Sequence, residues 1–157
     1  MKFNPPKKHI GAGAVFFNES GDMLIVKPVY KEGWLIPGGS VEKMESPRHA
    51  CEREVKEELN IDINIKILLC VDSVQIEPNK PFSLQFTFYG GILNKEQVSS
   101  IALPNQELSE FIFVSKNELS NFFPERKILR YNACFQAIQK KTVYYLENGK
   151  LNYENCP

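Results

Sequence analysis

The chain has 157 residues, of which 43% are hydrophobic and 24% are charged. This length and balance predict one globular domain over residues 1–157, with a core of its own, and exclude a fibrous or disordered chain. The 19 basic and 19 acidic residues cancel, so no charged surface for nucleic acid or an anionic membrane is expected, and any phosphate binding must be local.

The spacing of the cysteines and histidines argues against zinc and against disulfides. The two histidines and four cysteines are scattered and form no Cys-x-x-Cys pair, so we expect reduced thiols. The cysteines are Cys51, Cys70, Cys134 and Cys156. Residues 1–8 lack the apolar segment of a secretory signal, and no apolar run approaches the ~20 residues that span a bilayer. We therefore expect a cytoplasmic protein without a membrane partner.

The N-terminal part of the chain predicts a β-hairpin followed by a loop. The first strand is predicted over 9–17, a turn over 18–22 and the return strand over 23–27. A loop over 30–33 and a short connection over 34–37 follow. Gly11 and Gly13 in the first strand indicate close approach by another backbone or a ligand. The connection leads into a second glycine pair, Gly38 and Gly39.

Residues 47–59 predict a helix with well-marked ends. Ser46 is a suitable N-cap, Pro47 suits the first helical position, and Asn60 can adopt the left-handed geometry that closes a helix. On a wheel of 100° per residue, three carboxylates share one face about 100° wide. They belong to Glu54, Glu57 and Glu58. An adjoining apolar stripe, formed by Cys51, Val55 and Leu59, would dock on a core. A third group, His49, Glu52 and Lys56, would point to water.

The acidic face is unfavourable for a helix without a ligand. Like charges three or four residues apart cost roughly 0.2–0.5 kcal/mol each. The macrodipole disfavours anions in the last turn by about 0.3–1 kcal/mol each. A bound Mg²⁺ or Mn²⁺ would reverse both effects, because these ions take hard carboxylate oxygens. The alternative is an ordinary solvated acidic face.

The C-terminal part predicts alternating strands and helices. Apolar residues at every second position predict a half-buried strand over 61–69, extending towards residue 76. The further predictions, in order, are a turn over 77–81, a strand over 82–89 that Gly90-Gly91 bends or ends, a polar loop over 94–110, a strand over 111–114, a capping box at 115–118, a helix from Pro124 to about residue 140, and a hairpin over 143–153. Together these elements predict an α/β fold with a mixed sheet covered by helices.

The residues around the acidic helix resemble the signature of the Nudix (MutT-type) hydrolases. That signature is Gly, five residues, Glu, seven residues, then Arg-Glu-apolar-any-Glu-Glu-any-Gly-apolar. Eight of the nine fixed positions match here: Gly39, Glu45, Arg53, Glu54, Val55, Glu57, Glu58 and Ile61. The one departure is Asn60 in place of glycine, and Asn is the next-best residue for a left-handed cap.

The resemblance implies a Nudix α/β/α sandwich and a diphosphohydrolase that attacks phosphorus with water. It implies that Glu54, Glu57 and Glu58, with the carbonyl of Gly38, ligate Mg²⁺ or Mn²⁺. Arg53 would orient a glutamate, and Glu45 would brace the loop by pairing with Arg53. The general base stays open between Glu54 and a carboxylate before the 111–114 strand, either Glu107 or Glu110, with Glu107 favoured.

The expected substrate is a small molecule: a nucleoside diphosphate linked to a further group, which the sequence does not name. Candidate contacts are Lys27, Tyr30, Trp34, Gly38, Gly39, Phe82, Tyr131 and Asn132. For the aromatic residues the alternative is core packing, and for Lys27 it is simple exposure. A homodimer is compatible with these features.

Two other functions stay open on the sequence alone. The same fold could bind or sense a nucleotide without cleaving it, which the loss of a motif glutamate would favour. A protein with a coincidental acidic helix would leave the spacing of Gly39, Glu45 and Arg53 unexplained.

Overall fold

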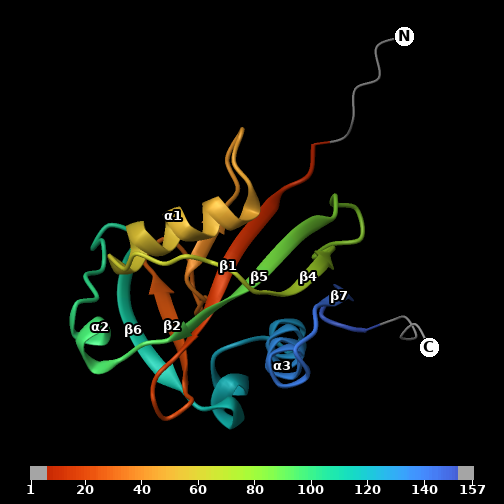
Figure 1. Ribbon diagram of the computed structural model, residues 1–157. Helices are drawn as coiled ribbons and strands as arrows, with labels where there is room; N and C mark the ends of the chain where they lie inside the picture. Colours follow the sequence, from red (N-terminus) through yellow and green to blue (C-terminus); the bar gives the residue numbers. More distant parts are fainter. Residues whose placement is uncertain (1–6, 152–157) are drawn as a thin grey trace.

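The computed structural model describes residues 7–151, and Figure 1 shows a β-sheet lying between helices. The strands are β1 (Ile10–Phe17), β2 (Met23–Pro28), β3 (Gly38–Ser40), β4 (Leu68–Val74), β5 (Ser83–Ile92), β6 (Leu108–Val114) and β7 (Tyr144–Glu147). The helices are α1 (Pro47–Leu59), α2 (Lys95–Ser99) and α3 (Glu125–Lys140), with a 3-10 helix, η1, over Lys116–Asn121.

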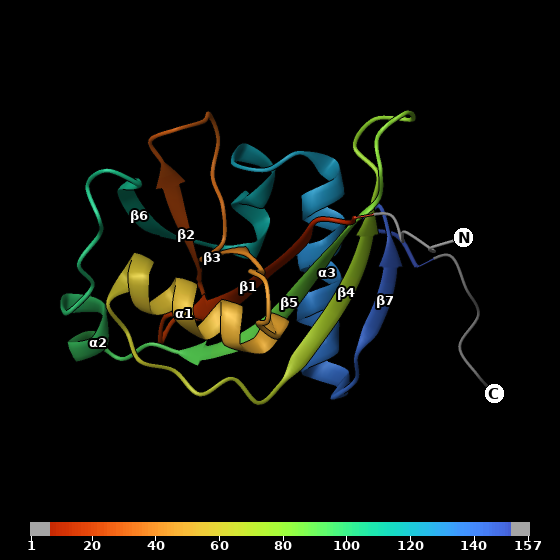
Figure 2. The same cartoon turned by 90° about the horizontal axis from the view of Figure 1, so that it is seen from above.

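The strands form one mixed sheet in the order β6-β2-β1-β5-β4-β7, with β3 paired to β1 off this path. The central strand β1 runs parallel to β5 and antiparallel to β2 and β3. Figure 2 shows α1 on one face of the sheet and α3 on the other. The expected α/β/α sandwich with a mixed sheet is therefore confirmed.

Alternate residues of β1 serve two separate cores. Ala14 and Phe16 pack with α1, whereas Val15 and Phe17 pack with α3 and η1. Because successive side chains of a strand point to opposite faces, the apolar run of β1 is explained by burial on both sides. Within residues 7–151, no helix is both long and apolar enough to cross a membrane.

The ends of α1 agree with the prediction. The Ser46 hydroxyl accepts a hydrogen bond from the His49 N–H at 3.2 Å, Pro47 opens the helix, and Asn60 has φ = 58°. The predicted apolar stripe is buried, at Cys51, Val55 and Leu59. The short-range signals therefore placed this helix to the residue.

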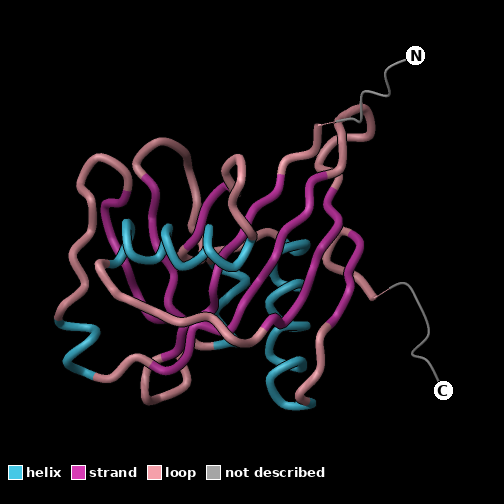
Figure 3. Tube along the Cα trace, turned by 45° about the horizontal axis from the view of Figure 1, so that its top comes forward, coloured by secondary structure: helices cyan, strands magenta, loops and turns pink. Residues whose placement is uncertain are grey.

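The strand predicted over 61–69 is wrong for most of its length. Residues 60–67 form an extended connection that Figure 3 shows running beside α1, and β4 begins only at Leu68. Ile61 and Ile65 are buried against the α1 core, so the apolar alternation reports burial without strand pairing. The Ile65 N–H donates to the Glu52 carboxylate at 2.8 Å, so Glu52 does not simply point to water as predicted.

Three other predictions need correction. Strand β5 continues through the glycine pair, with a bulge at Gly90, where a Cβ would overlap the Phe16 ring. The segment 94–110 contains the short helix α2 and the start of β6. The terminal strand β7 pairs parallel with β4, and only the turn at Asn148 and Gly149 with one bridge resembles a hairpin. Residues 152–153 of that hairpin lie outside the described residues.

The remaining C-terminal predictions hold. Ser115 and Glu118 form the predicted capping box, which opens η1. Helix α3 follows Pro124 and ends at Lys140. The described cysteines, Cys51, Cys70 and Cys134, are buried free thiols, and Cys156 lies outside the described range.

Candidate active site

The pairing of β3 with β1 brings the motif glycines against α1. Gly38 lies opposite Gly13, and Gly39 lies opposite Ala12. Gly38 has φ = 142°, and a Cβ there would overlap the Ala12 carbonyl. Glycine at this position is therefore required both by the backbone conformation and by the close approach of two strands.

Glu58 is the most buried of the three motif glutamates, with 6% of its surface exposed. Its Oε2 accepts a hydrogen bond from the Gly38 N–H at 2.8 Å. Its pKa is raised to about 8, mainly by burial and also by the carboxylates of Glu54, Glu107 and Glu57, against the opposing effect of the Gly38 hydrogen bond. A carboxylate held in these surroundings gains from a nearby cation.

Glu54 lies directly beneath Gly39. A Cβ on Gly39 would overlap the Glu54 carboxylate, so the glycine is what leaves room for this acid. Burial raises the pKa of Glu54, whereas the hydrogen bond from Arg53 lowers it. Two desolvated carboxylates, of Glu58 and Glu54, thus contact Gly38 and Gly39 of β3.

Arg53 connects three parts of the site: β3, the loop between β3 and α1, and the acidic face of α1. Its guanidinium donates to both oxygens of Glu45, at 2.9 and 3.1 Å, and to the Ser40 carbonyl at 3.1 Å. The same group donates to Glu54 at 3.0 Å and to Glu57 at 3.2 Å. The expected pairing of Glu45 with Arg53 is present, and this bond holds the pKa of Glu45 below its usual value.

Glu57 completes the acidic face but lies towards solvent, with its side chain 55% exposed. In the side-chain positions found here, no group of three His, Cys, Asp or Glu residues within 7–151 is poised around a metal ion. The donors nevertheless fit a hard divalent cation. Glu58 supplies a buried carboxylate and Glu54 a partly buried one, and the two repel each other. Glu57 lies on the same helix face, where its carboxylate pairs with Arg53.

The two loop carboxylates differ in their surroundings. The Glu107 charge raises the pKa of Glu54 and of Glu58, so this residue faces the acidic site. The Glu110 carboxylate instead lies near Lys27, with 3.9 Å between Oε2 and Nζ, and both of these side chains are half exposed. Of the two, Glu107 is the one whose charge reaches the motif glutamates.

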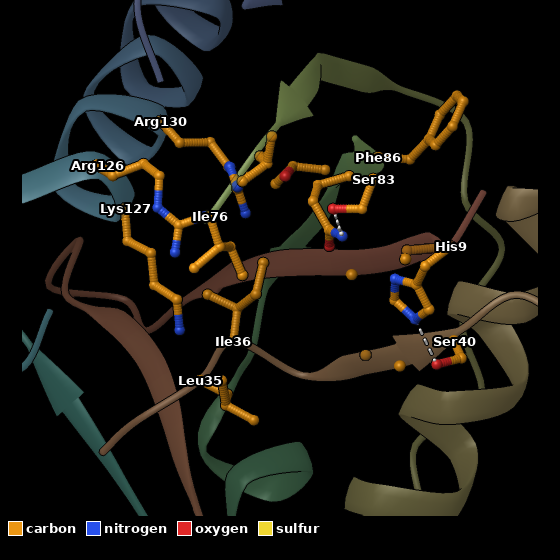
Figure 4. A pocket seen from close by; sticks show the side chains of 18 of the residues that line it. His9, Leu35, Ile36, Ser40, Ile76, Ser83, Phe86, Arg126, Lys127 and Arg130 are labelled. Carbon is orange, nitrogen blue, oxygen red and sulfur yellow. Dashed lines mark hydrogen bonds between the residues drawn. The ribbon is translucent and has the colours of Figure 1, made fainter. Parts of the chain in front are cut away.

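A cleft of about 560 Å³ opens beside β3. Figure 4 shows its arrangement, with β3 and the His9–Ser40 hydrogen bond towards α1 and the side chains of α3 at the opposite end. Gly38 and Gly39 line the cleft, while Glu58 and Glu54 contact these two glycines from outside its lining. A molecule could therefore place one end at the glutamates and the other in the cleft.

The predicted substrate residues divide into two groups. Gly38, Gly39, Tyr30 and Tyr131 line the cleft. The other four, which are not brought to it, are Lys27, Trp34, Phe82 and Asn132. Trp34 packs edge-on against Phe122, at 5.7 Å between ring centroids, and Lys27 lies over the Trp34 ring at 5.7 Å.

Several lining residues were not predicted from the sequence. They are His9, Lys31, Gln85, Arg126, Lys127 and Arg130. One signal was available for two of them, because Arg126 and Lys127 stand in the first turn of a helix, where the macrodipole disfavours cations. Nothing local marks the others, since the sheet order brings them together.

Comparisons with known proteins agree with this geometry. A NUDIX domain model matches residues 7–133. The chain is 31% identical over 153 residues to an uncharacterized Nudix hydrolase of Listeria monocytogenes. This alignment covers 92% of this chain and 87% of that protein. The structure of a MutT protein from Methanosarcina mazei has a TM-score of 0.67 at 22% identity, covering 87% of this chain and 99% of that one. An ADP-ribose pyrophosphatase from Streptococcus suis has a TM-score of 0.66 at 19% identity, covering 90% of this chain and 99% of that one. At these identities the two structures show a shared fold.

Proposed function

This chain belongs to the Nudix hydrolase family, and on that premise we propose that it cleaves the diphosphate linkage of a nucleoside diphosphate joined to a further group, with divalent metal. The observation that carries the proposal is the position of two carboxylates, the buried Glu58 and the partly buried Glu54, against Gly38 and Gly39 of β3. Such a pair is destabilising in the free protein and is stabilised by a bound cation, which can in turn bind a polyanion.

The residues suited to hold the cation are the three motif glutamates and the Gly38 carbonyl. Bound there, Mg²⁺ or Mn²⁺ would neutralise diphosphate oxygens and lower the pKa of a coordinated water. Arg53 keeps Glu54 in place through its 3.0 Å hydrogen bond and is itself anchored by Glu45. These two residues therefore act as positioning residues for the acidic face.

Proton removal from the attacking water needs a carboxylate, and two candidates stand. Glu54 is partly buried, with a raised pKa, and adjoins Gly39 of β3. Glu107 is exposed and approaches from the loop before β6. The Glu54→Gln and Glu107→Gln variants separate them, because loss of the base removes the corresponding limb of the pH–rate profile.

The direct test is a panel of nucleoside diphosphate derivatives with Mg²⁺ or Mn²⁺, in which the released monophosphates are identified. Cleavage within the diphosphate is the expected result, with loss of turnover in Glu58→Gln. Tight binding of the same compounds without turnover would support a nucleotide-sensing module in its place.

Location and assembly remain predictions of the sequence. We propose a cytoplasmic protein with one domain over residues 1–157, acting on a small nucleotide and not on nucleic acid. Light scattering of the purified chain would show whether it is a monomer or a homodimer.

A further inference from the structure

The first turn of α3 places two cations on the wall of the cleft. Arg126 and Lys127 both line it, and Figure 4 shows them reaching in from α3, at the end away from Ser40 and α1. The N-terminal turn of a helix favours anions and disfavours cations. Neither residue is therefore placed to stabilise its own helix.

Both cations lack a carboxylate partner. None of the ion pairs found between residues 7 and 151 includes Arg126 or Lys127. The neighbouring Arg130 shows the contrast, because its Nε donates to the buried Asp72 at 2.7 Å. The closest compensation for Lys127 is the ring of Phe123, 5.7 Å from its Nζ, which does not neutralise the charge.

The charges are also crowded and partly removed from water. The pKa of Lys127 is lowered to about 8, mainly by burial and also by the charges of Lys31, Arg130 and Arg126. Burial likewise lowers the pKa of Arg126, with Arg130 as the next cause. Lys31 lines the same cleft from the loop after β2. We call Lys31, Arg126 and Lys127 the α3 cation cluster.

We propose that the α3 cation cluster binds a phosphate monoester that the substrate carries on a ribose, apart from the scissile diphosphate. The inference rests on the proposed function, which places the diphosphate at the motif glutamates. The cluster lies at the other end of the cleft, so it meets a second anionic group on the substrate. A phosphate monoester carries a charge of about −1.5 to −2 and three acceptor oxygens. It therefore matches several cationic donors better than a carboxylate on the substrate would.

Matched substrates that differ by one phosphate monoester test the proposal. Two such pairs are ADP-ribose with its 2′-phosphate and dephospho-coenzyme A with coenzyme A. We expect the wild type to prefer the phosphorylated member of at least one pair by on the order of 10-fold in kcat/KM, and Lys127→Met and Arg126→Met to reduce that ratio towards one. Lys127→Arg, which keeps the charge, should restore it, and Lys140→Met in the last turn of the same helix should leave it unchanged.

Equal rates for both members of each pair, or a preference that survives Lys127→Met, would overturn the α3 assignment while leaving the hydrolase intact. Failure to cleave any of these compounds with Mg²⁺ or Mn²⁺ would instead count against the proposed function. Binding then decides the α3 assignment by itself, with inorganic phosphate as the probe and EDTA present.

In that measurement phosphate should raise the midpoint of thermal unfolding of the wild type above that in sodium chloride of equal ionic strength. The rise should be less than half as large in Lys127→Met and unchanged in Lys140→Met. An equal rise in all three proteins overturns the site. A larger rise with acetate than with phosphate overturns the choice of phosphate over carboxylate.

Discussion

The carboxylate of Glu58 accepts a 2.8 Å hydrogen bond from the backbone N–H of Gly38. This bond ties the last turn of α1 to the first residue of β3, and it occupies one oxygen of a carboxylate that is almost fully buried. The acid and the glycine are 20 residues apart in the chain, so their contact fixes the position of the acidic face relative to the cleft.

Glu58→Gln should fold well and lose activity. Between the ordinary carboxyl pKa and the value of about 8 in the folded chain, the folded state binds more protons than the unfolded state, so Glu58 reduces stability as pH rises. An amide avoids this effect and can still accept from Gly38. In EDTA at pH 8 the variant should therefore melt at a higher temperature than the wild type, while kcat falls by at least about 100-fold, or about 2.7 kcal/mol in the barrier.

Removal of the metal provides a second prediction, through the exposed glutamate. Mg²⁺ or Mn²⁺ should raise the melting temperature of the wild type over that in EDTA, because an ion that binds only the folded state stabilises it. Glu57→Gln should reduce this rise and cut turnover by orders of magnitude, with far-UV circular dichroism unchanged. Near-normal activity and an unchanged metal effect would remove Glu57 from the site.

Arg53→Met should disorganise the acidic face. It removes the donor shared by Glu45, Glu54 and Glu57, which would lower kcat by about 10–100-fold, as is usual for a group that orients metal ligands. Arg53 holds the pKa of Glu45 low, so their pairing stabilises the fold above the ordinary carboxyl pKa and is lost as pH falls. The loss of melting temperature should accordingly be larger at pH 7 than at pH 3. Equal losses at both values would show that the pair does not contribute through charge.

The sequence predicts the parts of this site that depend on short-range chemistry. Ser46 and Asn60 close α1 because caps need only their neighbours in the chain, and the predicted pairing of Glu45 with Arg53 is likewise close in sequence. The alternation at Ile61 and Ile65 misleads because burial against a helix and burial in a sheet leave the same pattern.

The far wall of the cleft could not be predicted, for a different reason. Arg126 lines the same cleft as Gly38 and Gly39 only because α3 packs on β4, which the sheet order places beside β5 and two strands from β1, and such long-range pairing has no local signal. The same holds for Trp34, whose aromatic character suits a ligand or a core equally, and which packs on Phe122. Here the topology decides which aromatic and cationic side chains reach the cleft.

Gly39→Ala should reduce activity more than stability. The added Cβ would displace the Glu54 carboxylate, whose contact with Gly39 leaves no space. Gly21→Ala is the matched control: Gly21 has φ = 84° with open space around it, so alanine there costs about 1 kcal/mol of stability and leaves the site untouched. Gly39→Ala should therefore have the lower kcat of the two variants, and Gly21→Ala the lower melting temperature.

Lys127→Met should stabilise the free protein at neutral pH. The pKa of Lys127 is about 8 in the folded chain and about 10.5 in the unfolded chain, so between these values the unfolded state binds more protons and stability rises with pH. Below pH 8 Lys127 is charged in both states, and its burial and the charges of Lys31, Arg126 and Arg130 reduce the stability of the folded chain by their full amount. The Phe123 ring, which also faces Lys127, offsets part of this loss. The variant should exceed the wild type in melting temperature at pH 7, and the difference should shrink as pH rises towards 10.5. A lower melting temperature for Lys127→Met at pH 7, with Lys140→Met unchanged, would show that the cleft compensates this charge in the absence of any ligand.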